Sequence, residues 1–330
     1  MKKVKQWTNY LVYILLHSLW YAISLLPLCV LYGLSDTLYY LMAYVIRYRH
    51  AVIWKNLTAS FPDKTVAELK AIEKGFYRYF CDYFVETIKL KTMRKSELMR
   101  RMTFSGVEAV NAILEEGQSV GFYLGHLGNW EWITSLPHWL TKEAVSCQIY
   151  HPLENVQMDR LFKEVREQQG AHCIPMAESL RKIVQFGRQG KPVIVGYIAD
   201  QSPLWWNIHH WVEFLHQDTP VFTGSERIVK HTNQAFVYGD VRRIKRGYYH
   251  CELKLVRRDT KGIADFELTD MYFQLLEQTI CREPEIYLWS HNRWKRTREE
   301  FNRLYYVDAQ GKVLERKDGT QTNASSKDKK

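Results

Sequence analysis

The chain begins with an apolar stretch from about Tyr10 to Leu34, which only four residues interrupt. An apolar run of about 20 residues can span a bilayer. The stretch lacks the small-residue cleavage site of a signal peptide, so an uncleaved anchor is predicted, with a buried core helix as the alternative. A second run, Leu38–Ile46, is too short to span and is predicted to lie at the interface. Residues 1–46 are thus expected to form a membrane anchor and interfacial segment.

A basic, mostly helical region is predicted for residues 47–105. Within Val66–Lys89 the apolar positions recur at helical spacing. The triplet Phe61-Pro62-Asp63 marks a break before that helix.

From about residue 119, short apolar runs alternate with helical stretches. The runs that predict strands are Val120–Leu124, Ala144–Tyr150, Val193–Ile198, Ala235–Tyr238 and His250–Val256. The stretches that predict helices are Trp130–Leu140, Val156–Gln169, Glu178–Arg188 and Glu267–Cys281. Such alternation favours an α/β fold, a sheet flanked by helices, over residues 106–315. The polar tail, residues 316–330, is predicted to be disordered.

Composition narrows the class of protein. Hydrophobic residues make up 46% and charged residues 25% of the chain, which excludes a chain disordered throughout. The net charge of +10 favours an anionic partner, either a membrane, an acidic protein or nucleic acid, but no known nucleic-acid module is visible. The six cysteines are scattered without a C-x-x-C pair, which argues against a zinc site and favours reduced thiols.

The segment Gly125–Trp132 carries the candidate chemistry. His126 follows a predicted strand, at the end where open α/β sheets place ligands, and Glu131 falls in the next helical turn. Asn129 is a candidate cap for that helix. An imidazole can take a proton from a hydroxyl, and a carboxylate on its other nitrogen fixes the tautomer. We therefore predict His126 as general base with Glu131 as its partner. The alternative is a structural histidine.

No G-x-S-x-G nucleophile motif is present. The reacting hydroxyl would then belong to the substrate, and an acyl group would pass to it directly. Backbone N–H groups at the start of the helix could stabilise an oxyanion.

The string from His126 to Glu131 resembles the H-x-G-N-W-E form of the acyltransferase motif. This form belongs to the late acyltransferases of lipid A biosynthesis, the lauroyl and myristoyl transferases of the lysophospholipid acyltransferase superfamily. Further similarity is found at Asn56-Leu57 with Phe61-Pro62, at Arg166, at Asp200-Gln201 and in a block from Tyr287 to Lys295, so that the resemblance runs from about residue 47 to 296.

The resemblance implies the following assignments. Fatty acyl groups would move from an acyl carrier protein thioester to a hydroxyl of a lipid A precursor, with no metal and no cofactor. His126 and Glu131 would be catalytic. The residues expected to bind or position substrates are Gly128, Asn129, Arg166, Asp200, Gln201, His291, Arg293 and Lys295.

The chemistry of the supporting residues leaves several roles open for each of them. Arg166 can offer a planar fork to a phosphate, or be an exposed helical charge. Asp200 can pair with Arg166, bind a sugar hydroxyl or cap a turn. His291, Arg293, Lys295 and Arg296, interleaved with tryptophans, form a cationic cluster suited to phosphorylated lipid headgroups, or a solvated charged face.

The implied partners are acyl carrier protein, an anionic lipid acceptor and the membrane surface, with no nucleic acid. The implied location is the bacterial inner membrane, with the catalytic domain on the cytoplasmic side. Three alternatives stay open. The acceptor could be a lysophospholipid, an aminolipid or a glycolipid; the chain could be a non-catalytic lipid-binding relative; or, on charge alone, it could bind nucleic acid.

Overall fold

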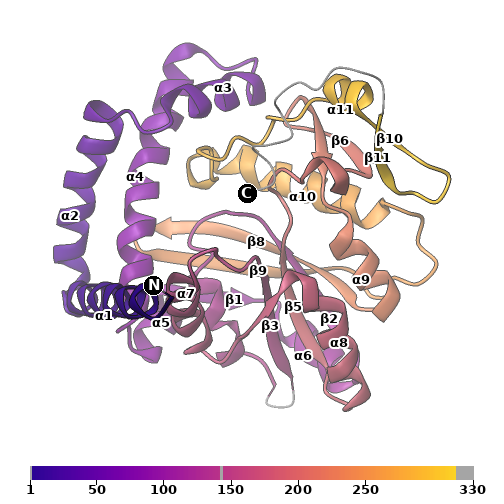
Figure 1. Cartoon of the computed structure of the whole chain (residues 1–330), viewed down its shortest axis with the longest axis horizontal. Coiled ribbons are helices and arrows are strands. Elements are labelled where there is room, and N and C mark those ends of the chain that lie inside the picture. Colours follow the sequence, from indigo (N-terminus) through magenta and orange to yellow (C-terminus); the bar gives the residue numbers. More distant parts are fainter. Residues whose placement is uncertain (1, 142–143, 317–330) are drawn as a thin grey trace.

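The chain folds around a mixed seven-stranded sheet, shown with its surrounding helices in Figure 1. The computed structural model describes residues 2–141 and 144–316, so the expected tail lies, apart from Arg316, outside the described residues. In spatial order the strands are β1 (Met102–Ser105), β9 (Tyr248–Arg257), β8 (Ala235–Lys245), β2 (Val120–Leu124), β5 (Val193–Ile198), β3 (Val145–Tyr150) and β4 (His172–Pro175). Strands β8 and β9 form an antiparallel hairpin, whereas all other neighbours are parallel. The predicted α/β class is confirmed.

The predicted apolar runs coincide with the middle of this sheet. All five residues of β2 are buried, as expected of a strand covered on both faces. The edge strands β1 and β4 are only four residues long and gave no such signal. Strand β1 precedes the expected domain start at residue 106, yet it pairs with β9 along its whole length.

Helices and two small hairpins surround the sheet. The helices after β1 are α6 (Val107–Glu115), α7 (Val156–Glu167), α8 (Ser179–Arg188), α9 (Gly224–Thr232), α10 (Glu267–Arg282) and α11 (Arg298–Leu304). The hairpins are β6 (His210–Phe214) with β7 (Gln217–Val221) and β10 (Tyr305–Val307) with β11 (Val313–Glu315). Short 3-10 helices are η2 (Trp132–His138), η3 (Met176–Glu178), η4 (Trp205–Asn207) and η5 (Pro284–Ile286). All six cysteines are free.

One predicted helix has a different form. Over Trp130–Leu140 the chain makes the 3-10 helix η2, which contains Pro137. Proline has no N–H to continue an α-helical ladder, so the tighter turns persist instead.

The N-terminal region is a group of helices at one side of the sheet (left in Figure 1). They are α1 (Lys2–Leu25), α2 (Leu28–Tyr40), the π-helical η1 (Leu41–Val45), α3 (His50–Ser60), α4 (Val66–Leu90) and α5 (Lys95–Arg101). The expected span from Tyr10 to Leu34 is wrong as a single helix, because Pro27 separates α1 from α2. The run Leu38–Ile46 continues α2, so that Leu28–Val45 is the helix, among the described residues, long and apolar enough to be a candidate membrane anchor.

Buried polar contacts join α1 to the rest of the protein. The buried Lys89 of α4 donates to the carbonyls of Ser24 and Leu26, at 2.9 and 3.0 Å. These carbonyls lie at the end of α1, where a cation is favourable. Trp20 donates through Nε1 to the carbonyl of Ile88 at 3.0 Å. Lys89 is therefore a structural link between α1 and α4.

Helix α4 is the central support of this region. It begins with a capping box in which Thr65 and Glu68 satisfy each other's backbone N–H groups. Its buried Asp82 accepts from Ser35 of α2 at 2.7 Å and from Arg243 and Arg246 of the β8–β9 hairpin. The N-terminal helices and the sheet are thus tied together through one helix.

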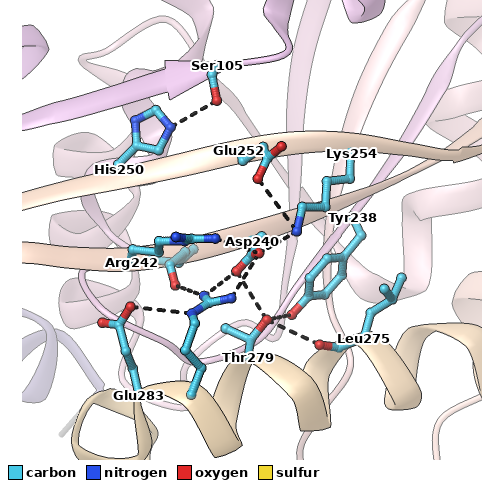
Figure 2. Close-up of polar contacts among 12 residues, drawn as sticks. Ser105, Tyr238, Asp240, Arg242, His250, Glu252, Lys254, Leu275, Thr279 and Glu283 are labelled. Carbon is cyan, nitrogen blue, oxygen red and sulfur yellow. Dashed lines mark hydrogen bonds and ion pairs between the residues drawn. The ribbon is translucent and has the colours of Figure 1, made fainter.

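A second buried carboxylate, Asp240 of β8, joins the hairpin to α10. Figure 2 shows Lys254 and Thr279 reaching it from opposite sides, and Arg282 completes the set. The side chain of Asp240 is 2% exposed. Burial alone would raise its pKa, but the bonds and charges of Arg282 and Lys254 hold it below the usual value.

This network predicts a large stability effect. Asp240→Ala should lower the free energy of unfolding by about 3–5 kcal/mol, because it leaves two cations without their buried partner. Denaturant unfolding of the detergent-solubilised protein measures this. The matched control is Asp218→Ala, which removes the exposed Asp218–Arg298 pair and should cost less than about 1 kcal/mol. Equal losses in the two variants would contradict the assignment.

Candidate active site

His126 and Asp200 follow two adjacent parallel strands. In the register of the sheet Leu124, the last residue of β2, pairs with Ile198, the last residue of β5. His126 and Asp200 each lie two residues beyond these ends. The sheet therefore brings them level with each other at its carboxyl edge, where open α/β sheets bind ligands.

The two side chains form a tight pair. Nδ1 of His126 lies 2.6 Å from Oδ1 of Asp200, and the backbone N–H of His126 donates to Oδ2 at 3.0 Å. An ionised carboxylate only accepts, so Nδ1 carries a proton, and in the neutral ring the lone pair is then on Nε2. Asp200 thereby fixes both the position and the tautomer of the imidazole.

Asp200 is held ionised by this pair. Its side chain is 2% exposed, and burial by itself would raise its pKa. The charge of His126 and the two hydrogen bonds outweigh burial and bring the pKa below the usual value. The pair is thus stabilised above the ordinary aspartate range and loses this stabilisation as the pH falls through the lowered pKa.

The second ring nitrogen of His126, Nε2, lies beside a cavity. Gln201 donates through Nε2 to Nε2 of His126 at 3.2 Å, and both residues line that cavity. The side chain of His126 is 17% exposed, so its second nitrogen is accessible while its first is buried against Asp200. The ring of Trp130 crosses it edge-on, with centroids 5.2 Å apart.

Glu131 is not bonded to His126 in the part of the chain that the structure describes. Its two oxygens accept from Nε and Nη2 of Arg166, at 2.8 and 2.5 Å. The expected His126–Glu131 contact is thus replaced by His126–Asp200, and the Arg166 fork expected for a phosphate is taken by Glu131. The physical reason is placement: Glu131 precedes η2 and faces α7, whereas Asp200 follows the strand next to β2.

One face of α4 supports the loop that carries His126. Tyr79 donates to the carbonyl of Gly128 at 2.6 Å, Tyr83 packs on Trp130 with centroids 4.0 Å apart, and Glu86 accepts from Nδ2 of Asn129 at 2.7 Å. These three residues follow helical spacing, so they share a face. They were not singled out from the sequence as site residues. The signal that could have found them is two tyrosines and a carboxylate on the buried face of a predicted helix.

Gly128 and Asn129, expected to bind substrate, are buried within this loop. Gly128 has φ +55°, and a Cβ there would lie 2.9 Å from Val241 Cγ1, so glycine alone fits. Oδ1 of Asn129 accepts from the N–H of Trp132, the first residue of η2, at 3.0 Å, but the N-cap position itself is Glu131 and not Asn129. Both residues shape the loop and neither lines the cavity among the described residues.

The C-terminal block is a scaffold as well. The predicted surface cluster is wrong for Arg293, which is 1% exposed and donates to the carbonyl of Pro220 at 2.7 Å. Burial lowers the pKa of His291 to about 4, so this ring is neutral and accepts from the N–H of Ser202. Of His291, Arg293 and Lys295, only Lys295 is exposed. Leu127 bridges to Tyr287, and the block thereby supports both loops of the site.

The cavity beside the pair has a volume of about 1120 Å³. Apolar side chains of β2 and β5, among them Phe122, Leu124 and Ile194, form one part of its wall. Cationic side chains, including Lys163, Arg166 and Arg227, lie elsewhere along it. A space of this kind suits an amphiphile with an apolar chain and an anionic end.

A histidine oriented by a buried carboxylate beside such a cavity is typical of an enzyme that moves protons on an amphiphilic substrate. The chain belongs to the bacterial lipid A biosynthesis acyltransferases, because the model of that family matches residues 1–296. It is therefore an acyltransferase, of a family that acts on lipid A-like substrates. No curated protein matches the chain.

The Glu131–Arg166 pair predicts strong coupling. Glu131 is 5% exposed in its side chain, so Arg166→Met should cost about 3 kcal/mol by leaving a carboxylate unpaired. The double variant Glu131→Met, Arg166→Met should lose less than the sum of the single losses, with a coupling energy of about 1–3 kcal/mol in denaturant unfolding. The exposed pair Glu178–Arg181 is the control, with about 0.5 kcal/mol or less. Additive losses at Glu131 and Arg166 would contradict the pairing.

Proposed function

We propose that the protein transfers a fatty acyl group from an acyl carrier protein thioester to a hydroxyl of a lipid A precursor, at the cytoplasmic face of the bacterial inner membrane. The observation that carries the proposal is the His126–Asp200 pair, whose accessible nitrogen lies on a large, partly apolar cavity. The family match supports the acyl transfer and the lipid class. The reaction requires no metal and no cofactor.

The proposed chemistry follows from the tautomer. The acceptor hydroxyl replaces the amide of Gln201 at Nε2 of His126 and gives its proton to that nitrogen as its oxygen attacks the thioester carbon. Asp200 stabilises the imidazolium that forms. When the tetrahedral intermediate collapses, the carbon–sulfur bond breaks and the thiolate takes the proton back from His126. The hydroxyl thus becomes an ester, and the carrier leaves as a thiol.

The Glu131–Arg166 pair has a positioning role in this scheme. Glu131 holds Nε and Nη2 of the guanidinium, so the fork is fixed at the cavity wall. The remaining edge, with Lys163 and Arg227, offers positive charge to a phosphate of the acceptor or donor. The predicted catalytic role of Glu131 becomes a role exerted through Arg166.

The apolar N-terminal surface supports membrane attachment. Leu15, Leu19, Leu34 and Val45 are each 50–73% exposed along α1, α2 and η1. Asp36, in the middle of Leu28–Val45, pairs with Arg246 of the β8–β9 hairpin. A charged pair at the bilayer centre is costly, so we propose that these helices lie in one leaflet beside the catalytic domain.

The test is an acylation assay on purified protein. Acyl carrier protein thioesters of several lengths are combined with an under-acylated lipid A precursor, and products are read by mass. Wild type should add the mass of one acyl chain, and His126→Ala should be slower by about 10²- to 10⁴-fold. His172→Ala, an exposed histidine outside the cavity lining, should stay close to wild type.

Two results would change the account. Acylation of a lysophospholipid, aminolipid or glycolipid, with none of the lipid A precursor, would keep the chemistry and replace the acceptor. Wild-type activity in His126→Ala would contradict the proposed base.

A further inference from the structure

Glu86 is a fully buried carboxylate that the chemistry above does not use. It lies in the last turns of α4 with 0% exposure. Its Oε1 accepts from the hydroxyl of Tyr32 on α2 at 2.9 Å. Its Oε2 accepts from Asn129 at 2.7 Å and from the hydroxyl of Tyr249 on β9 at 3.0 Å. No lysine, arginine or histidine pairs with it among the described residues.

The contact with Asn129 connects Glu86 to the loop of the reacting histidine, because Asn129 lies three residues after His126. Asn129 uses its amide nitrogen on Glu86 and its amide oxygen on the N–H of Trp132. The indole of Trp132 donates back to the carbonyl of Glu86 at 3.2 Å. Glu86 therefore holds both the loop that presents His126 and the start of the helix that follows Glu131.

The surroundings of the carboxylate consist of donors. Tyr32, Tyr249 and Asn129 each direct a polar hydrogen at it, and an ionised carboxylate accepts all three. A protonated carboxyl group carries a hydrogen of its own among these donors, so one contact must be lost or a hydroxyl must turn. The neighbouring charges are Asp82, one turn earlier on α4, and Arg243 of β8, which pairs with Asp82. Tyr79 of α4 adds the Gly128 contact.

We propose that Glu86 is a positioning residue whose ionised form sets the active loop, so that its protonation lowers the rate of acyl transfer. The activity part of this inference rests on the proposed function. Through the Asn129 contact, the proton on Glu86 controls the placement of His126 relative to the substrate.

Because Glu86 is buried, it can gain or lose its proton near neutral pH. Burial raises the pKa of Glu86 to about 7, with Asp82 adding to the shift and the bonds from Asn129, Tyr32 and Tyr249 opposing it. A raised pKa stabilises the fold at low pH, and this stabilisation is lost as the pH rises through the folded value. The ionised form that activity requires is therefore the less stable one.

Activity and stability thus depend on the proton of Glu86 in opposite directions, and a purely structural role of Glu86 would not produce this opposition. Rates of acylation are measured from pH 5.5 to 9 for wild type and Glu86→Gln, which keeps the shape but is always neutral. At pH 8.5 Glu86→Gln should lose up to about 10²-fold in kcat, with KM little changed, because the loop is displaced. The acid limb of wild type should contain the ionisation of Glu86, and this ionisation should be missing from the limb of Glu86→Gln.

Tyr32→Phe is the matched variant. It removes a donor to Oε1 and leaves the Asn129 contact on Oε2 in place. Loss of a donor to the charged form raises the pKa of Glu86, so the acid limb should shift to higher pH while kcat at pH 8.5 stays near wild type. An unshifted limb would overturn the proposal.

Unfolding by denaturant provides an arm that needs no substrate. Relative to wild type, Glu86→Gln should gain stability between pH 5 and pH 8. A stability difference between Glu86→Gln and wild type that does not change with pH would overturn the proposal. The same holds if Glu86→Gln loses activity and stability in parallel, or if it keeps the kcat and the acid limb of wild type. If wild type acylates no acceptor, the proposed function fails, and the stability arm still decides whether Glu86 titrates.

Discussion

The arrangement of the site depends on the hydrogen bond between Nδ1 of His126 and Asp200. This contact exists because β2 and β5 are adjacent, parallel and in register up to their last residues. It assigns the proton to Nδ1 and leaves a lone pair on Nε2, at the cavity. The other parts of the site serve this geometry: Gln201 occupies the accessible nitrogen, Trp130 bounds the ring, and the C-terminal block supports both loops.

Helix α4 connects the site to the rest of the protein. On one side it fixes the His126 loop through Tyr79, Tyr83 and Glu86, and on another it binds α2 through Asp82 and Ser35. Lys89 at its end holds the last carbonyls of α1. The apolar N-terminal helices and the His126 loop thus share one support.

Much of the fold could be predicted from the sequence, because the central strands are continuous apolar runs and the long helices have clear periodicity. The bounds of β2 and β5 agree with the predicted runs residue for residue. Short edge strands such as β1 lack this signal, and the N-terminal break at Pro27 was outweighed by the apolar composition around it.

The site was only partly predictable. His126 and its loop were found because their motif is contiguous in sequence. Glu131 was expected to contact His126 because it is near in sequence, whereas Asp200, which does bond His126, becomes near only when β2 and β5 pair. Arg293 and His291 were expected at the surface because charged residues usually lie there, yet tertiary packing buries Arg293 and leaves His291 half-buried. Strand order, which a single sequence does not report, decides which carboxylate meets the histidine.

The central claim is tested most directly by the protonation of His126 itself. In detergent-solubilised protein with ¹⁵N-labelled histidine, the ring signals of His126 are assigned by difference from His126→Gln and followed at a pH where the ring is neutral. The account predicts a proton on Nδ1 and a bare Nε2, with this preference lost in Asp200→Ala. A proton on Nε2 in the wild-type protein, or a preference that survives in Asp200→Ala, would contradict it.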